Sequence, residues 1–155
     1  QKEWDKMSQC SKDLFLRFGL EGLKKRNPQD LSGGEKQRLA LCVALGKEAD
    51  YYFLDEPTKG MDAKSKKLFG ELLKEWTKME KSIVMVSHDM EFTAKYADEI
   101  SLLYQGEIIV QCPVREFMEE NQFYTTGMNR VTRRVNPHII TIEDVKKYAK
   151  RKNSQ

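Results

Sequence analysis

The chain has 155 residues, which is the size of one domain or of a large part of one. Its composition, 39% hydrophobic and 33% charged, supplies a core and excludes disorder over the whole length. The longest apolar stretch, residues 39–45, is far shorter than the roughly 20 residues of a membrane span, and no signal segment opens the chain, so we expect any membrane association to be peripheral.

The first part of the chain predicts two helices and then a strand. Apolar side chains at helical spacing predict a helix over residues 3–18, which a polar stretch follows. Residues 34–45 predict a second helix that ends near Gly46. Residues 51–54 are an apolar, aromatic-rich run that is typical of a strand, and Pro57 stops it.

A second strand, residues 83–86, follows a helix that Asp62 can cap. The apolar stripe of that helix consists of Leu68, Leu72, Leu73, Trp76 and Met79. Continuous apolar strands suit a parallel sheet that is covered on both faces. In a strand–helix–strand unit both strands run the same way, so their carboxyl ends lie side by side, at the edge where open α/β sheets bind ligands.

The rest of the chain predicts shorter elements and ends in a basic segment. The expected elements are a helix over residues 91–97, strands over 100–104 and 107–110 around a Gln105-Gly106 turn, and helices over 115–120 and about 141–150. From Asn129 onward, eight Lys or Arg residues stand against Glu143 and Asp144. Such a segment is either a solvated face or a surface for nucleic acid or an anionic membrane. The three cysteines lack metal-ligand spacing, which favours a reduced compartment.

Residues 31–38, with the sequence LSGGEKQR, are the most informative stretch. Ser32 and Glu35 can form a capping box, so one interpretation is an ordinary helix start. That interpretation leaves Gly33 and Gly34 unexplained, because glycine is unfavourable in a helix, and the pair indicates that another group approaches the backbone closely. The alternative is a phosphate site, since a helix N-terminus offers free N–H groups to an anion.

Two adjacent carboxylates, Asp55 and Glu56, end the first strand. Because successive strand side chains point to opposite sides, the two cannot easily share one role. One could face Mg²⁺ held with nucleotide phosphates while the other deprotonates a water; alternatively, both simply meet solvent. His88 follows the second strand, so we expect it at the same edge, where it could contact a phosphate or act only as a structural hydrogen-bonding group.

These motifs, in this order and at these spacings, resemble the C-terminal part of an ABC ATPase domain from about residue 27 to residue 111. Residues 31–38 match the family's signature, residues 51–56 are similar to its Walker B strand, and Gly60-Met61-Asp62 resembles its D-loop. His88 falls at the position of the family's switch histidine. The resemblance implies an α/β fold, namely part of the P-loop NTPase fold of ABC ATPases, with a helical signature subdomain, parallel strands and a C-terminal extension.

The resemblance also implies roles for individual residues. The groups that would touch the γ-phosphate of an ATP held by an opposing ATPase domain are Ser32, Gly33, Gly34 and Gln37. Asp55 would bind Mg²⁺ through water, Glu56 would be the catalytic base, and His88 would sense the γ-phosphate. Asp62 would tie the two ATPase domains together.

A phosphate-cradling loop of the form Gly-x-x-x-x-Gly-Lys-Ser/Thr is missing from the sequence. Its one Gly-Lys pair, Gly46-Lys47, has Leu41 where the first glycine belongs. We therefore expect a fragment that is inactive alone, from a full-length ATP hydrolase. The expected divisions are a helical subdomain (1–46), the C-terminal part of the ATPase core (47–120) and a basic extension (121–155).

Within the family, residues 55–63 and 123–126 resemble cobalt-type and energy-coupling-factor importer ATPases. This resemblance implies ATP-driven import of vitamins or transition metal ions, with a second ATPase domain and membrane subunits as partners. It implies a peripheral location on the cytoplasmic face of a prokaryotic plasma membrane and a tail that contacts a partner rather than nucleic acid. Two alternatives remain, a soluble ABC ATPase of DNA repair or chromosome maintenance and a non-hydrolysing regulatory module, although Glu56 argues against the second.

Overall fold

The computed structural model describes residues 8–152, so residues 3–7 of the first predicted helix lie outside the described part. The chain divides into two compact units at the His88–Asp89 bond. We call residues 8–88 the signature unit and residues 89–152 the C-terminal unit. Each unit is described by itself.

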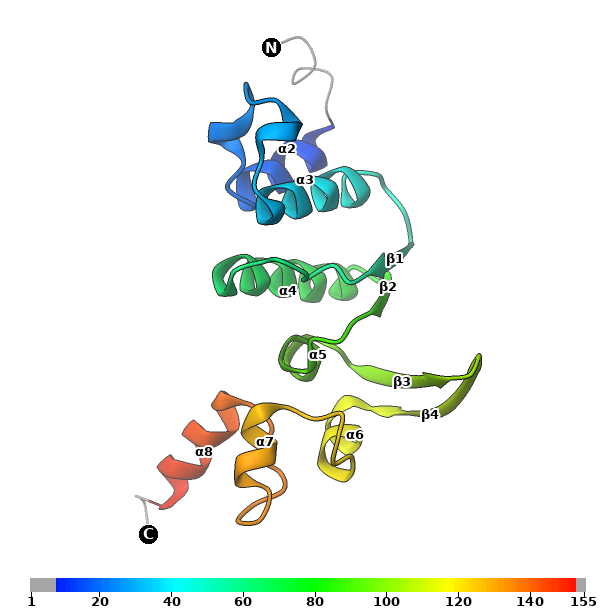
Figure 1. Cartoon of the computed structure of the whole chain (residues 1–155), viewed down its shortest axis with the longest axis vertical. Coiled ribbons are helices and arrows are strands. Elements are labelled where there is room, and N and C mark those ends of the chain that lie inside the picture. Colours follow the sequence, from blue (N-terminus) through cyan, green and yellow to red (C-terminus); the bar gives the residue numbers. More distant parts are fainter. Residues whose placement is uncertain (1–7, 153–155) are drawn as a thin grey trace. The chain divides into compact units, whose positions relative to one another are not determined.

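The signature unit begins with helical segments (Figure 1), which contribute buried apolar side chains to its core. Helix α2 (Gln9–Arg17) starts at Ser8, whose side chain caps it, and helix α3 (Gly33–Leu45) ends at Gly46, as predicted. Two short 3-10 helices, η1 (Glu21–Leu23) and η2 (Pro28–Asp30), form in the stretch between them. The buried side chains that α2 and α3 contribute are Leu14, Phe15, Leu41, Cys42 and Leu45.

The predicted strand–helix–strand unit is present. Strands β1 (Tyr51–Asp55) and β2 (Ser82–Val86) pair in parallel, with Asp55 opposite Val86, and helix α4 (Ala63–Lys78) connects them. Asp62 caps α4 as predicted. The buried stripe of α4 differs from the prediction, since Phe69 is completely buried whereas Met79 is 66% exposed beyond the helix end.

One face of the β1–β2 sheet is open, which corrects the expectation that both faces are covered. The side chains on this face are Tyr51, Phe53, Val84 and Val86, and they are between 54% and 76% exposed. On the opposite face, Tyr52 and Leu54 are buried. The prediction failed because an apolar run shows that a strand needs cover on both sides, not that the described residues provide it.

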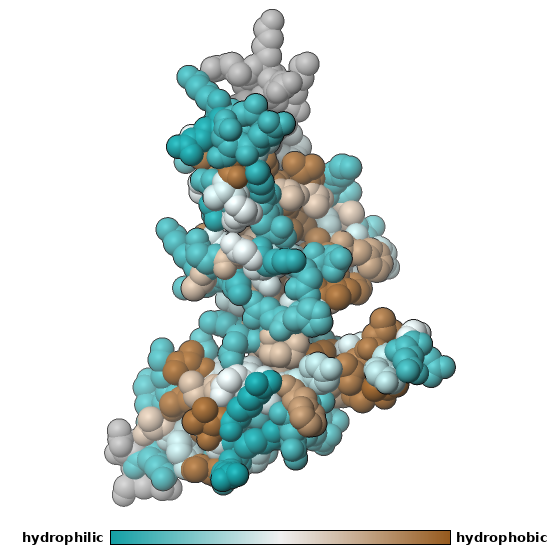
Figure 2. All heavy atoms as spheres, viewed as in Figure 1, coloured by the Kyte–Doolittle hydropathy of each residue, from teal (hydrophilic) through white to brown (hydrophobic). Residues whose placement is uncertain are grey.

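The C-terminal unit combines helices with a hairpin. It contains α5 (Met90–Tyr96), β3 (Glu99–Tyr104), β4 (Glu107–Pro113), α6 (Val114–Glu120), α7 (Gly127–Thr132) and α8 (Ile142–Lys152). The two strands are antiparallel, and Gln105 and Gly106 both have positive φ, as a tight hairpin turn requires. Figure 2 shows apolar side chains gathered along this hairpin, with hydrophilic ones at its tip. Helix α7 was not predicted.

The C-terminal unit contains a buried polar network, which consists of Thr125, Thr126 and Asn129. The side-chain amide of Asn129 donates to the carbonyls of Pro137 (2.7 Å) and Ile139 (3.1 Å). The Thr126 hydroxyl donates to the carbonyl of Ile140 (2.6 Å) and accepts from the Asn129 N–H (3.0 Å). The network therefore fixes α7 against the segment that leads into α8.

Candidate functional site

The start of α3 is a complete capping box. The Ser32 hydroxyl accepts from the Glu35 N–H (3.3 Å), and the Glu35 carboxylate accepts from the Ser32 N–H (2.7 Å). The hydrogen bond from the Ser32 N–H is the main cause that keeps the pKa of Glu35 below its usual range. Ser32 itself is exposed. The capping interpretation is thus confirmed, and it accounts for Ser32 and Glu35 without accounting for the glycines.

The two glycines of the signature meet different surroundings. A Cβ atom built on Gly34 would lie 2.9 Å from the carbonyl oxygen of Gly60, a distance that real Cβ atoms do not show. A Cβ atom on Gly33 would have nothing within 4 Å. Gly34 is therefore required by the chain's own D-loop, while Gly33 leaves its side of the helix open to an outside group.

Gln37, on the next turn of α3, is used within the chain. Its side-chain amide donates to the carbonyls of Glu56 (3.4 Å) and Pro57 (3.1 Å), in the turn that follows β1. The contact of Gln37 with a γ-phosphate stays a prediction. What the structure adds is a direct connection between the signature helix and the residue expected to be the catalytic base.

Glu56 and His88 come together at the carboxyl ends of β1 and β2. The Glu56 N–H donates to the carbonyl of Val86 (2.9 Å), which holds Glu56 beside the neighbouring strand. Its backbone has φ of 44°, a left-handed conformation that costs a non-glycine residue on the order of 1 kcal/mol. The His88 Nε2 atom lies 3.7 Å from Glu56 Oε1, and the imidazole is 92% exposed. Backbone strain of this kind persists only where the surrounding structure enforces it, and it is concentrated at functional sites.

The two aspartates have different local settings. Asp55 is the last residue of β1 and is exposed. Asp62 accepts from the Ser65 N–H (2.7 Å), and the hydrogen bonds from Ser65 are the main reason that the pKa of Asp62 lies below its usual range. The second oxygen of Asp62 lies 3.9 Å from an Arg38 guanidinium nitrogen. Asp62 is therefore an ionised helix cap at the D-loop.

The carboxylates fit part of a magnesium–nucleotide site. Within residues 8–152, no group of three or more His, Cys, Asp or Glu side chains is arranged to hold a metal ion by itself. Glu56 Oε1 is buried and has no hydrogen-bond partner, which is costly for a carboxylate oxygen and is relieved by a water or another donor. Because Mg²⁺ usually keeps waters and takes one or two carboxylates with phosphate oxygens, the exposed Asp55 suits it without a protein cage, which leaves Glu56 free to act on a water.

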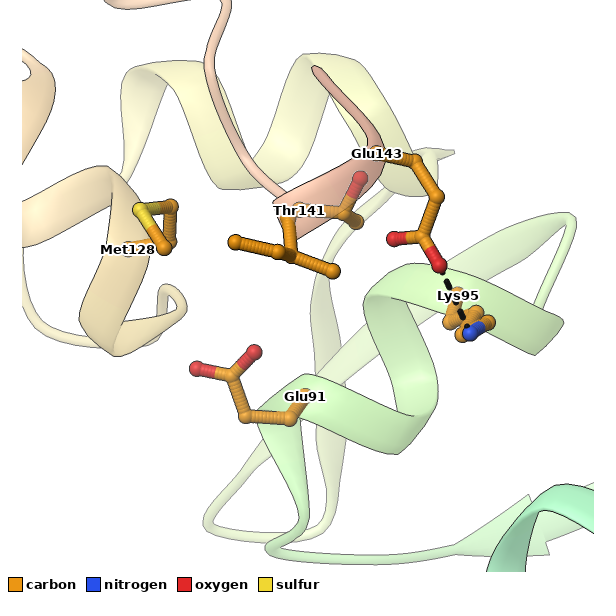
Figure 3. A pocket seen from close by; sticks show the side chains of 6 residues that line it. Glu91, Lys95, Met128, Thr141 and Glu143 are labelled. Atoms are coloured by element: carbon orange, nitrogen blue, oxygen red, sulfur yellow. Dashed lines mark hydrogen bonds and ion pairs between the residues drawn. The ribbon is translucent and has the colours of Figure 1, made fainter. Parts of the chain in front are cut away.

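Sequence reasoning missed Arg38 and the approach of Gly60. The Arg38 side chain is 16% exposed, and its guanidinium lies among α3, the D-loop and the start of α4. The i to i+4 spacing from Gly34 is the available signal, since it places both residues on one face of α3. A small pocket in the C-terminal unit (Figure 3) has a Lys95–Glu143 ion pair on its wall and includes none of the predicted site residues.

The family can be identified from known proteins. Residues 2–59 match the family model described as ABC transporter. An ABC transporter ATP-binding protein of Bacillus thuringiensis subsp. konkukian is 41% identical over 92% of this chain, and one of Pyrococcus abyssi is 42% identical over 65% of it. The chain belongs to the ABC transporter ATP-binding family. It spans 28% of the length of the Bacillus protein and 39% of the Pyrococcus protein.

Solved structures agree with this family. The chain is similar to cbiO1 from Clostridium perfringens, part of the ABC transporter complex cbiONQ (TM-score 0.57, 26% identity, 83% of this chain and 50% of that one). It is also similar to MJ0796, a bacterial ABC transporter cassette with a dimeric structure (TM-score 0.62, 28% identity, 69% of this chain and 47% of that one). The described residues therefore adopt part of the α/β fold of ABC ATPases. Among them, no helix is long and apolar enough to cross a membrane.

Proposed function

We propose that this ABC ATPase chain is part of a domain that binds and hydrolyses ATP to drive transport. The observation that carries the proposal is Glu56, which has a strained backbone at the carboxyl end of a parallel strand, a buried carboxylate oxygen without a hydrogen-bond partner, and His88 beside it. A polar strand end that merely met solvent would need neither the strained backbone nor the buried oxygen. ATP and Mg²⁺ are the proposed cofactors, with Asp55 as the Mg²⁺-binding carboxylate.

Glu56 would act on the attacking water. A carboxylate oxygen that has no other hydrogen-bond donor can accept a hydrogen bond from a water. It can then take that proton as the water attacks. His88, mostly exposed and 3.7 Å from that oxygen, can donate toward the same water or toward a phosphate oxygen. Mg²⁺, when bound, would neutralise charge on the phosphates. The Gln37 amide donates to the carbonyls of Glu56 and Pro57 and so helps to fix the turn that carries Glu56.

The chain would contribute to two composite sites and complete neither. Ser32 and Gly33 lie on the open side of α3, where they could meet a nucleotide held by a second ATPase domain. Glu56 and His88 would serve a nucleotide whose phosphate loop lies outside these 155 residues. The missing loop and its lysine would supply most of the phosphate contacts, so we expect no activity from the chain by itself.

The open face of the β1–β2 sheet supports a role as one part of a larger domain. A parallel sheet is stable when both faces are covered, and here Phe53 and Val86 are 76% and 61% exposed. The chain matches about half of each solved ATPase, with 50% and 47% of their lengths covered. We propose that the remaining part of the same ATPase domain covers this face.

Import is the direction of transport that we propose. Motif resemblance points to cobalt-type and energy-coupling-factor ATPases, and the similar cbiO1 is part of the complex cbiONQ. The partners would be a second ABC ATPase domain and membrane subunits, with this domain bound peripherally at the cytoplasmic face. The dimeric structure of the similar MJ0796 supports the first of these partners.

The test is steady-state ATP hydrolysis by the complete ATPase that contains this chain. The Glu56→Gln variant, which keeps the size of the side chain but cannot accept a proton, is expected to lower kcat by about 100-fold or more. Glu71→Gln, on the exposed side of α4, is the matched control and is expected to leave kcat unchanged. Unchanged hydrolysis in Glu56→Gln would remove Glu56 from the mechanism.

A further inference from the structure

Near its N-terminus, helix α3 has one face that packs against the D-loop and one face that is open. Gly34 and Arg38 share the inner face, because residues four apart lie above one another on a helix. Gly34 lies against the carbonyl of Gly60, so the helix backbone touches the D-loop with no side chain between them. Gly33 is on the open side. The same short stretch can therefore meet an outside ligand and the D-loop together.

Arg38 joins three elements. One guanidinium nitrogen donates to the Ser65 hydroxyl at the start of α4 (3.3 Å) and lies 3.9 Å from Asp62 Oδ2 in the D-loop. Its Nε–H is buried and has no acceptor. Because arginine stays charged in proteins, this is a largely buried cation whose donors are only partly satisfied. A small movement of the D-loop would change how well Asp62 satisfies it.

Gln37 makes a second connection, from the neighbouring position on α3. Its amide donates to the carbonyls of Glu56 and Pro57, so it holds the turn that carries the catalytic carboxylate. Asp62 meanwhile caps α4 through Oδ1. Thus α3 is hydrogen-bonded to the Glu56 turn through Gln37 and to the start of α4 through Arg38. It meets the D-loop through the ion pair with Asp62, whose side chain is 65% exposed, and through the close approach of Gly34 to Gly60.

We propose that Arg38 is a positioning residue that couples the ligand-facing start of α3 to the D-loop and, through it, to the setting of Glu56. The D-loop is joined to the Glu56 turn by backbone bonds, from the Met61 N–H to the Thr58 carbonyl and from the Lys59 N–H to the Glu56 carbonyl (both 3.1 Å). The proposal rests on the proposed function, in which Ser32 and Gly33 meet a nucleotide on a second domain. The helix start and Arg38 are about 9 Å apart along a stiff helix, at 1.5 Å per residue, so a displacement at one is carried to the other. Arg38 acts through Asp62 and Ser65 and does not itself touch the nucleotide.

The test is a double-mutant cycle on kcat and KM in the complete ATPase. Arg38→Met removes the charge at similar length, and Asp62→Asn keeps a residue that caps helices well while removing the charge that faces Arg38. Each variant is expected to lower kcat about tenfold with KM for ATP within about twofold, and the double variant is expected to be no slower than either single one. Arg38→Lys, which keeps the charge but not the fork of donors, is expected to recover part of kcat.

The control is Lys67→Met, in an exposed ion pair with Glu71 on α4, and it is expected to leave kcat unchanged. Unchanged kcat in Arg38→Met, or losses that multiply to about 100-fold in the double variant, would overturn the coupling. If Arg38→Met does not fold, the cycle is run with Arg38→Lys, with the same criterion of non-additivity. Hydrolysis by the unaltered ATPase and its loss in Glu56→Gln report on the proposed function separately, so the two ideas can fail independently.

Discussion

The two units differ in how their polar side chains are satisfied. In residues 8–152, the two buried side-chain polar atoms without a hydrogen-bond partner, Arg38 Nε and Glu56 Oε1, both belong to the signature unit. In the C-terminal unit, Asn129 is fully buried and its amide and carbonyl groups all have partners. Buried polar groups in stable proteins are normally paired, so the signature unit keeps two unsatisfied groups near its candidate site, whereas none is found among the described residues of the C-terminal unit.

The largest effect on stability is expected at Asn129. Asn129→Ala removes the buried amide that donates to the carbonyls of Pro137 and Ile139, and it leaves Ile139 only a longer bond from the Thr132 hydroxyl (3.4 Å). The free energy of unfolding of the C-terminal unit should therefore fall by about 3 kcal/mol. Urea unfolding measures this loss. Gln122→Ala, an exposed amide in the same unit, should change the free energy by less than about 0.5 kcal/mol. A similar small change for both variants would show that the network is not what stabilises the unit.

The signature glycines offer a sharper contrast. Gly34→Ala should destabilise the signature unit by about 1–3 kcal/mol, because the new methyl group meets the Gly60 carbonyl. Gly33→Ala should leave stability unchanged or raise it by up to about 1 kcal/mol, since alanine restricts the unfolded chain and meets nothing in the folded one.

The Gly33→Ala substitution should lower the rate of ATP hydrolysis although it does not lower the stability of the fold. In the complete ATPase, Gly33→Ala is expected to slow hydrolysis by about tenfold or more, because the methyl group stands where the second domain's nucleotide would approach. Thermal unfolding and kcat, measured on the same preparations, separate the two effects. Full activity in Gly33→Ala would mean that the open side of α3 does not face a ligand.

The smallest effect is expected at the wall of the pocket in Figure 3. The hydrogen bond from Lys95 (2.8 Å) is the main cause that holds the pKa of Glu143 below its usual range. A lowered folded-state pKa gives stability that is present above the unfolded pKa of about 4.3 and is lost as the pH falls through the folded value. Because both side chains are more than 40% exposed, the contribution should be about 0.5 kcal/mol.

A comparison of the unaltered chain with Lys95→Met isolates this contribution. The difference between their free energies of unfolding should be about 0.5 kcal/mol near pH 6 and should vanish by about pH 3. A difference that grew on acidification would have the wrong sign for this ion pair.

Much of the fold follows from local signals. The limits of α3 were predicted because Ser32 and Glu35 form a box that depends on adjacent residues alone. The meeting of Glu56 and His88 was predicted because parallel strands bring their carboxyl ends together. Both inferences need only spacing and strand direction.

The rest depends on contacts between distant residues. Helix α7 has six residues and is fixed by bonds from Asn129 to carbonyls near Ile139, which no local pattern reveals. Phe69 was missed because Leu68, beside it, also fits the apolar period of α4. The approach of Gly34 to Gly60 depends on how α3 packs against the D-loop, so the sequence shows an unusual glycine without showing what it meets.

The central claim is that these 155 residues hold parts of two nucleotide sites and complete neither. Calorimetric titration of the chain alone with Mg-ATP tests it most directly, beside the same titration of the complete ATPase. The account predicts no measurable binding to the chain at micromolar nucleotide, since most phosphate contacts come from a loop that it lacks, and binding to the complete ATPase. Tight one-to-one binding to the chain alone would contradict it.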